Sequence, residues 1–195
     1  MIRPRGPPED GPDFIYSSSE LEEMRHDIQT FKDSGFLRTE RGDGFVFGIL
    51  KASDGAERGL LIDVDRNSEL VRLASPFKCV FHRAFDEVLG NGGSPVDETV
   101  RSVKACGFDG VLTSGGPGSA VDNLDVLTRV VHAATAENIE VIVGGGVRSS
   151  NARVLRKKLP RPEGSRVWSH SSCLTKQSGD IVDADELNSL GNILS

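Results

Sequence analysis

The sequence predicts an α/β fold in which parallel strands alternate with helices. Apolar, strand-like runs alternate with amphipathic helical segments along the chain, and polar or glycine residues follow each run. The predicted strands end near residues 5, 50, 84, 114, 143 and 170. The later spacings are about 30 residues, the length of one strand–helix unit. Strict alternation of this kind requires a parallel sheet whose strands are joined by crossover helices.

The first half of the chain contains three of the six predicted strands. Residues 1–6 are expected to end a strand and to enter a loop rich in proline and glycine. Serines and glutamates at 17–23 are typical of a helix start, and we expect that helix to end at Gly35. Its apolar stripe has helical spacing and consists of Leu21, Met24, Ile28 and Phe31. The segments that follow are predicted as a strand at 44–50, a loop at 51–59, a short helix through 70–73 that closes at Pro76, and a strand at 78–85.

The second half of the chain repeats the same unit. A loop at 90–93 leads to a helix opened by Ser94 and Pro95, because proline is favoured in the first turn of a helix. Strands at 110–116, 139–143 and 166–170 are each followed by a helix. These helices are expected through 124–134, from a cap among 149–151 to Pro160, and at 184–194 behind a cap at Asp183. We interpret residues 1–195 as a single domain.

Charge, hydropathy and cysteine content indicate a mildly acidic intracellular protein. The 23 Lys and Arg against 29 Asp and Glu give a net charge of −6, which gives no indication of a nucleic-acid partner. No apolar run approaches the roughly 18 residues of a membrane span, and no secretory leader is recognisable, so we expect no membrane partner. Three cysteines without close spacing argue against a disulfide scaffold and favour a reducing compartment, the cytoplasm.

Two architectures accept this pattern of elements. A (β/α)8 barrel needs eight units and about 250 residues, so this chain is short of it by two units. An open, doubly wound sheet is complete with six strands, although no GxGxxG motif follows the first strand. The pattern alone leaves both architectures open.

Polar residues and glycines gather at the predicted carboxyl ends of the strands, the edge at which both architectures bind ligands. They are Arg3 and Arg5; His82, Arg83 and Asp86; Thr113 and Ser114; Gly144, Gly145 and Gly146; and His170, Ser171 and Ser172. Guanidinium groups match carboxylate and phosphate oxygens, and glycine turns allow backbone N–H groups to approach a phosphate. The set therefore predicts a site for a small anionic ligand, at which His82 or Asp86 is the candidate catalytic group.

Each of these residues also has a purely structural interpretation. The two N-terminal arginines are equally consistent with surface charges, and the glycines with tight turns. In a regular strand His82 and Arg83 point to opposite faces, so only one of them is expected to face the ligand. As metal ligands, His170 and Cys173 are weak candidates because no further ligand stands at a convincing spacing.

Five short motifs of the chain occur in the order of a known family. They are Ile2–Gly6, Phe81–Asp86, Leu112–Gly116, Gly144–Val147 and His170–Ser172. Together they resemble the CutC family, whose members are called copper homeostasis proteins, and Phe81–Asp86 is the most diagnostic of the five. The resemblance implies an incomplete (β/α)8 barrel of the TIM-barrel type with about six units. Residues 2–5 correspond in it to the third strand, and the first two units are missing.

The resemblance also implies a function, copper homeostasis with a copper ion bound in the cytoplasm. The cysteine-rich first strand of the family belongs to the part that this chain lacks, so the copper ligands stay unknown. The alternative is a TIM-barrel enzyme that acts on a small anionic or phosphorylated substrate at the strand ends. Because an open barrel leaves two strand edges unpaired, a homo-oligomer that covers them is a further expectation.

Overall fold

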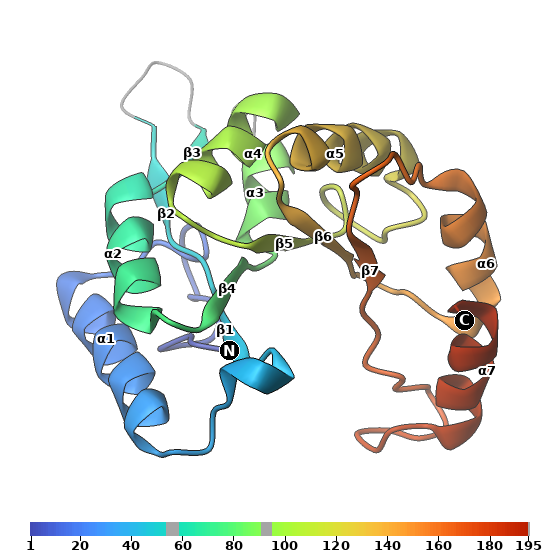
Figure 1. The fold of residues 1–195 in the computed structure, drawn as a ribbon, viewed down its shortest axis with the longest axis horizontal. Coiled ribbons are helices and arrows are strands. Elements are labelled where there is room, and N and C mark those ends of the chain that lie inside the picture. The colour runs from blue at the N-terminus through green and yellow to red at the C-terminus, as the bar shows by residue number, and fades with distance from the viewer. Residues whose placement is uncertain (54–58, 91–94, 195) are drawn as a thin grey trace.

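The architecture is a curved parallel sheet with helices on its outer side (Figure 1). The computed structural model describes residues 1–53, 59–90 and 95–194. The strand order is β1-β4-β5-β6-β7, and every neighbouring pair is parallel. The strands are β1 (Gly44–Phe47), β4 (Lys78–Phe81), β5 (Gly110–Thr113), β6 (Glu140–Val143) and β7 (Val167–Ser169). The alternation of strand and helix that the sequence predicts is therefore present.

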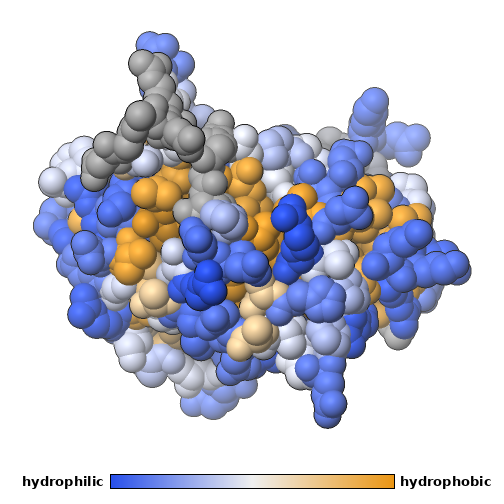
Figure 2. Space-filling model, turned by 90° about the horizontal axis from the view of Figure 1, so that it is seen from above, coloured by the Kyte–Doolittle hydropathy of each residue, from blue (hydrophilic) through white to orange (hydrophobic). Residues whose placement is uncertain are grey.

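Seven α-helices are found in the described residues. They are α1 (Ser18–Asp33), α2 (Val64–Ala74), α3 (Ala84–Gly90), α4 (Val96–Ala105), α5 (Leu124–Ala136), α6 (Ser149–Lys158) and α7 (Ala184–Leu194), with a 3-10 turn η1 at Thr39–Arg41. On the face shown in Figure 2, hydrophobic residues appear as patches between predominantly hydrophilic side chains.

The two faces of the sheet differ in burial because side chains alternate along each strand. Residues that face the helices form the core, among them Phe47, Phe81, Val111 and Val141. The intervening residues of the other face, such as Val46, Val80 and Ile142, are only half-buried, and Trp168 is 58% exposed. The described residues thus cover this inner face only in part. The homo-oligomer that would cover it stays a prediction.

Three predictions about the N-terminal half were wrong. Residues 1–6 form no strand, and Ile2 makes a single sheet-like contact, from its N–H to the carbonyl of Val46 at 2.9 Å. The expected strand at 44–50 ends at Phe47, and the chain then enters an antiparallel hairpin of β2 (Leu50–Ala52) and β3 (Leu60–Ile62). Phe31, expected in the buried stripe of α1, is 51% exposed.

Helix starts account for three further differences. The strand predicted at 78–85 ends at Phe81, because α3 begins at Ala84. Helix α2 begins at Val64, where the carboxylate of Asp63 accepts a hydrogen bond from the amide of Arg66. Helix α6 is capped at Arg148 instead of within 149–151, and the side chain of Asn151 accepts from the Arg148 amide. Of the predicted loop at 90–93, Gly90 belongs to α3, and Pro95 is the N-cap of α4; residues 91–94 lie outside the described residues.

Among the residues that the structure describes, no helix combines the length and the apolar character that crossing a bilayer requires.

Candidate functional site

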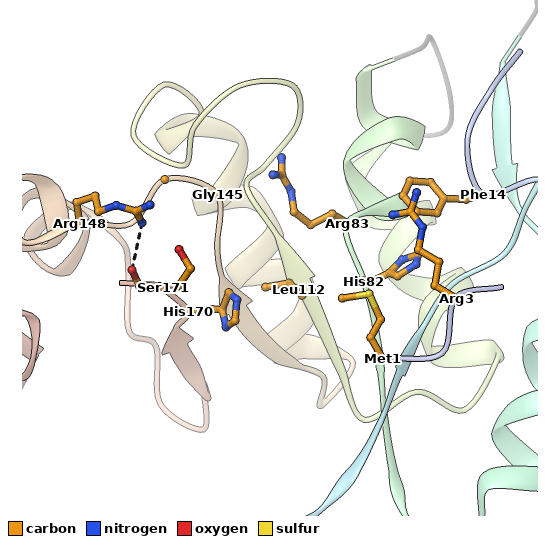
Figure 3. A pocket seen from close by; sticks show the side chains of 12 residues that line it. Met1, Arg3, Phe14, His82, Arg83, Leu112, Gly145, Arg148, His170 and Ser171 are labelled. Atoms are coloured by element: carbon orange, nitrogen blue, oxygen red, sulfur yellow. Dashed lines mark hydrogen bonds between the residues drawn. The ribbon is translucent and has the colours of Figure 1, made fainter. Parts of the chain in front are cut away.

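A cavity of about 350 Å³ lies at the carboxyl ends of the parallel strands. Three arginines line it, together with two histidines and the backbone of the loop after β6. Figure 3 shows Gly145 and Arg148 on one side of the cavity, Arg3 and His82 on the other, and Arg83 between them. The rest of the lining is Met1, Phe14, Leu112, Gly146, His170, Ser171 and Ser172.

The loop after β6 brings two consecutive backbone amides to the cavity. Gly145 and Gly146 have φ angles of 86° and 73°, in the left-handed region that favours glycine. A Cβ atom on Gly145 would lie 2.7 Å from Cβ of Ser114, so the loop approaches β5 more closely than another residue allows. Within the described part of the chain, neither of these two N–H groups donates to an acceptor. Successive amides in such a conformation form a concave site for an anion.

Arg83 is held in place by the buried carboxylate of Asp86. Its Nε donates to Oδ2 of Asp86 at 2.7 Å, and its Nη2 donates to the hydroxyl of Ser114 at 2.7 Å. Asp86 also accepts from the hydroxyl of Thr113 at 2.5 Å and from the amides of Ser114 and Gly116 at 3.1 Å. The Asp86 carboxylate therefore ties the start of α3 to the end of β5, and the Arg83 guanidinium lies 3.5 Å from the Cβ position of Gly145.

Arg148 has no carboxylate partner among the described residues. Its Nη1 donates to the carbonyl of Val147 at 2.7 Å and to the hydroxyl of Ser171 at 3.2 Å. Its Nε and Nη2 donate to no acceptor in the described ranges. The start of α6 beside it is occupied, because the amide and hydroxyl of Ser149 both donate to the carboxylate of Glu186. We call Arg83, Gly145, Gly146 and Arg148 together the strand-end cradle.

His82 is buried at the opposite end of the cavity. Its ring packs on Phe14 with a centroid separation of 4.6 Å. Its Nδ1 accepts a hydrogen bond from the amide of Ala84 at 3.3 Å, and its Nε2 has no partner among the described residues. Burial, with the nearby Arg3 guanidinium as the next cause, lowers the pKa of His82 to about 4. The imidazole is therefore neutral near pH 7.

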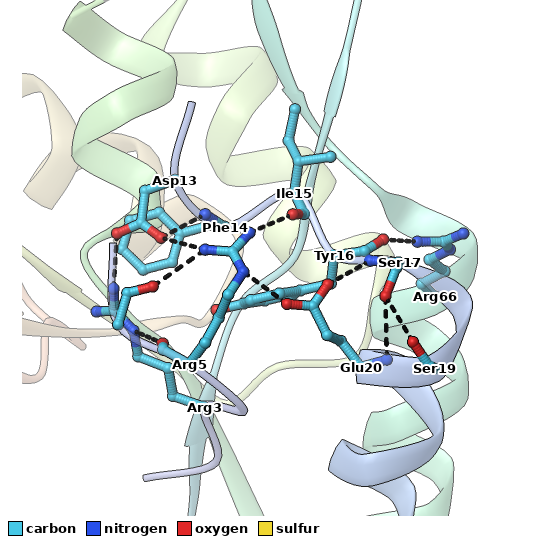
Figure 4. A network of polar contacts seen from close by, with 11 residues as sticks. Arg3, Arg5, Asp13, Phe14, Ile15, Tyr16, Ser17, Ser19, Glu20 and Arg66 are labelled. Carbon is cyan, nitrogen blue, oxygen red and sulfur yellow. Dashed lines mark hydrogen bonds and ion pairs between the residues drawn. The ribbon is translucent and has the colours of Figure 1, made fainter. Parts of the chain in front are cut away.

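The two N-terminal arginines belong to a polar network that we call the N-terminal arginine network (Figure 4). It consists of Arg3, Arg5, Asp13 and Glu20. Nη2 of Arg3 lies 2.7 Å from Asp13, and Nε of Arg5 lies 2.5 Å from Glu20. Arg5 also donates to the carbonyls of Ile15 and Gly6. The structure thus places Arg3 at the cavity and Arg5 outside it.

Most of the residues predicted for the site lie in or directly behind the cavity. His82 and Arg83 both line it, contrary to the strand periodicity, because β4 has already ended at Phe81. His170, Ser171 and Gly145 also line it. Thr113, Ser114 and Asp86 lie behind the lining and are joined to one another by hydrogen bonds, and Gly144 packs against the Leu112 side chain.

Sequence reasoning missed Arg148. The available signal was its place two positions after the glycine run at 144–146, at the start of a helix. Phe14 could not have been found, because it reaches His82 from a loop 68 positions away in the sequence (82 − 14).

The cysteines do not form a metal site in this part of the protein. Within the described ranges, no three His, Cys, Asp or Glu side chains form a group that could hold a metal ion. Cys79 and Cys106 are buried, and burial raises the pKa of each thiol to about 12, which disfavours the thiolate that binds Cu(I). Cys173 is also buried. The described residues therefore do not fit a copper site of three such ligands.

The structure is that of an α/β protein of the TIM-barrel type. It has a curved parallel sheet, helices on the outer side of the sheet, and a ligand-sized cavity at the strand ends. The sequence model of the CutC family matches residues 1–160. A CutC family protein of Treponema denticola is 36% identical to this chain over 157 residues, which are 80% of this chain and 54% of the relative. The human copper homeostasis protein cutC homolog is 34% identical over 179 residues, which are 92% of this chain and 56% of the relative. The chain belongs to the CutC family, as its five motifs predicted.

A solved structure shows the same fold. The crystal structure of CutC from Streptococcus agalactiae has a TM-score of 0.65 and 24% identity, and the match covers 93% of this chain and 72% of that one. The prediction of a TIM-barrel-type fold, left open by periodicity and implied by the resemblance, is confirmed. The chain spans about half the length of the curated relatives it matches, 54% and 56% of the two above.

Proposed function

We propose that this chain binds a small anionic ligand with a phosphate group in the strand-end cradle. The observation that carries the proposal is the set of unused donors at one spot. The amides of Gly145 and Gly146 and two nitrogens of Arg148 have no acceptor in the described residues. Gly145 and Arg148 are half-buried and Gly146 is exposed, and all three line the cavity, so an acceptor group bound there would satisfy these donors.

The chemistry of these donors favours phosphate. A phosphate group offers several acceptor oxygens in a tetrahedral arrangement, which matches two neighbouring amides and the planar donor fork of an arginine. Asp86 neutralises only part of the positive charge, since it pairs with Arg83 whereas Arg148 has no carboxylate partner in the described ranges. The cradle therefore keeps a net positive charge for a doubly charged ligand.

Isothermal titration with inorganic phosphate and with glycerol 3-phosphate tests this proposal. We expect Arg148→Gln to lower the affinity for both by about tenfold, because it removes a charged donor without disturbing an ion pair. Arg129→Gln is the matched control, since Arg129 is exposed on α5 and does not line the cavity. Absence of phosphate binding, or an equal loss in both variants, would contradict the proposal.

The same site supports the enzyme alternative, in which His82 or Asp86 acts on the bound anion. Asp86 accepts hydrogen bonds from Arg83, Thr113, Ser114 and Gly116, so its carboxylate orients the cradle more directly than it reaches a ligand. Turnover of a phosphorylated substrate that disappears in His82→Phe would support catalysis, and binding without turnover would support a sensor or carrier.

A copper ion bound in the cytoplasm is the second candidate function, and the copper homeostasis names of the relatives support the copper part of it. Two cases are possible for the copper ligands. In the first, Cys173 and His170 of this chain bind the ion. In the second, the ligands belong to the part of the longer relatives that lies beyond the match. Competition of the chain with a chromogenic Cu(I) chelator tests the first case. Binding that is lost in Cys173→Ser supports it, and no competition by the unchanged chain rules it out.

A further inference from the structure

The imidazole of His82 carries a hydrogen-bond donor that the protein itself does not use. Nδ1 accepts from the amide of Ala84, so the single proton of the neutral ring resides on Nε2. That nitrogen is buried and has no partner among the described residues, while the side chain is one of those that line the cavity. A buried donor left without an acceptor costs free energy, and at a cavity it indicates that a ligand supplies the acceptor.

The surroundings of His82 hold the ring in one orientation. Phe14 packs on it at 4.6 Å, and the Arg3 guanidinium lies 4.9 Å from the centre of the Phe14 ring. Gly48 leaves room for the other edge, since a Cβ there would lie 2.8 Å from Nδ1 and 3.0 Å from Cε1. Nδ1 faces Gly48 and Ala84, and Nε2 lies on the other side of Cε1 in the ring.

The charge state of His82 suits a neutral acceptor. The low pKa of the ring, caused first by its burial, keeps it uncharged at neutral pH. A neutral N–H group forms a hydrogen bond to a carbonyl or hydroxyl oxygen without the electrostatic preference for an anion that a guanidinium has. Figure 3 shows His82 across the cavity from Gly145 and Arg148, so a ligand bound at the cradle must span the cavity to contact His82.

We propose that Nε2–H of His82 donates a hydrogen bond to an uncharged oxygen of the ligand whose phosphate the strand-end cradle holds. The ligand class is then a phosphate ester of a short carbonyl compound, and His82 determines its specificity. This inference rests on the proposed function, because the cradle must first bind the phosphate.

Two pairs of probes separate the oxygen from the phosphate. Hydroxyacetone phosphate and n-propyl phosphate have the same three-carbon chain and differ in the carbonyl, and a five-carbon pair extends the reach of the comparison. We expect the unchanged protein to bind the carbonyl member of at least one pair about tenfold more tightly, since a site built around a donor rejects an analogue without the acceptor.

His82→Phe should bring that preference close to one while it keeps the ring that packs on Phe14. His82→Gln, which retains an N–H donor, should restore part of the preference. His132→Phe is the matched control, because His132 is exposed on α5 and does not line the cavity, and it should keep the full preference.

A nitrogen-edited proton NMR spectrum of the unchanged protein gives a readout other than affinity. The Nε2–H proton of His82 should move downfield with hydroxyacetone phosphate and stay in place with n-propyl phosphate. Binding of inorganic phosphate without any carbonyl preference overturns this inference alone. Absence of all phosphate binding overturns the proposed function together with it.

Discussion

The N-terminal arginine network and the strand-end cradle both contain arginines, but the arginines of the two regions have different partners. In the network, Arg5 donates to Glu20 and to the carbonyls of Ile15 and Gly6, and its guanidinium lies over the Tyr16 ring. In the cradle, Arg148 makes two contacts through one nitrogen and keeps its other donors unused by the described residues. Residue type alone predicts an anion site for both. The number of donors without a partner separates an arginine that builds structure from one that is available to a ligand.

Asp86 forms the ion pair that fixes Arg83 in the cradle, and its removal should have the largest effect. Asp86→Ala leaves the charge of Arg83 unpaired and the buried donors of Thr113 and Ser114 without an acceptor. We expect the free energy of unfolding to fall by about 3–5 kcal/mol, because several buried donors lose their acceptor while the exposed Arg83 can be solvated. Denaturation in urea measures it, with Asp125→Ala on the exposed side of α5 as the control. A loss below about 1 kcal/mol would show that the carboxylate does not organise the cradle.

His82 lies between the two regions, and its pKa predicts a loss of stability in acid. The unfolded chain takes up a proton on this residue near pH 6.5, whereas the folded protein does so only near pH 4. As the pH falls through that window the unfolded state binds more protons, so the free energy of unfolding falls, by about 3 kcal/mol at most.

The difference between the unchanged protein and His82→Phe isolates this contribution, because the carboxylates titrate in both. We expect the free energy of unfolding of His82→Phe to decline less between pH 6.5 and 4. Parallel profiles would mean that His82 titrates normally and is not held neutral beside the cavity.

Arg5→Gln sharpens the comparison from the side of the N-terminal arginine network. It removes a half-buried ion pair with Glu20 and two hydrogen bonds to carbonyls, so the free energy of unfolding should fall by about 1–2 kcal/mol. The affinity for inorganic phosphate should change by less than about threefold. A tenfold loss of affinity with unchanged stability would assign Arg5 to the ligand after all.

The alternation of strands and helices could be predicted because each strand is a short apolar run bounded by polar residues or glycine. The hairpin of β2 and β3 could not, because a single glycine, Gly48, is all that interrupts the apolar run at 44–50 where β1 ends and β2 begins. Helix α3 was missed for a similar reason, since Ala84 and Phe85 prolong the apolar pattern of β4.

The site was predictable as a set of residues and not as an arrangement. Strand ends identify His82, Arg83 and Gly145, because parallel strands bring their carboxyl ends to one edge. Which arginines keep unused donors depends on contacts between segments distant in the sequence, such as that of Arg5 with Glu20. No pattern within one segment contains that information.

The helix cap beside Glu20 tests the N-terminal arginine network at its outer edge and should have the smallest effect. The hydroxyl of Ser17 accepts from the amide of Glu20 at 3.2 Å, and the Glu20 carboxylate accepts from the Ser17 amide at 2.7 Å. The hydrogen bond from the Ser17 amide is the largest cause of the lowered pKa of Glu20, and Arg5 contributes less. Ser17→Ala should therefore reduce the free energy of unfolding by about 1 kcal/mol and leave phosphate affinity unchanged. Ser18→Ala, one position into α1, is the control. An equal loss of unfolding free energy in that variant would mean that the cap hydrogen bond contributes nothing and that Arg5 and Asp13 hold the network without it.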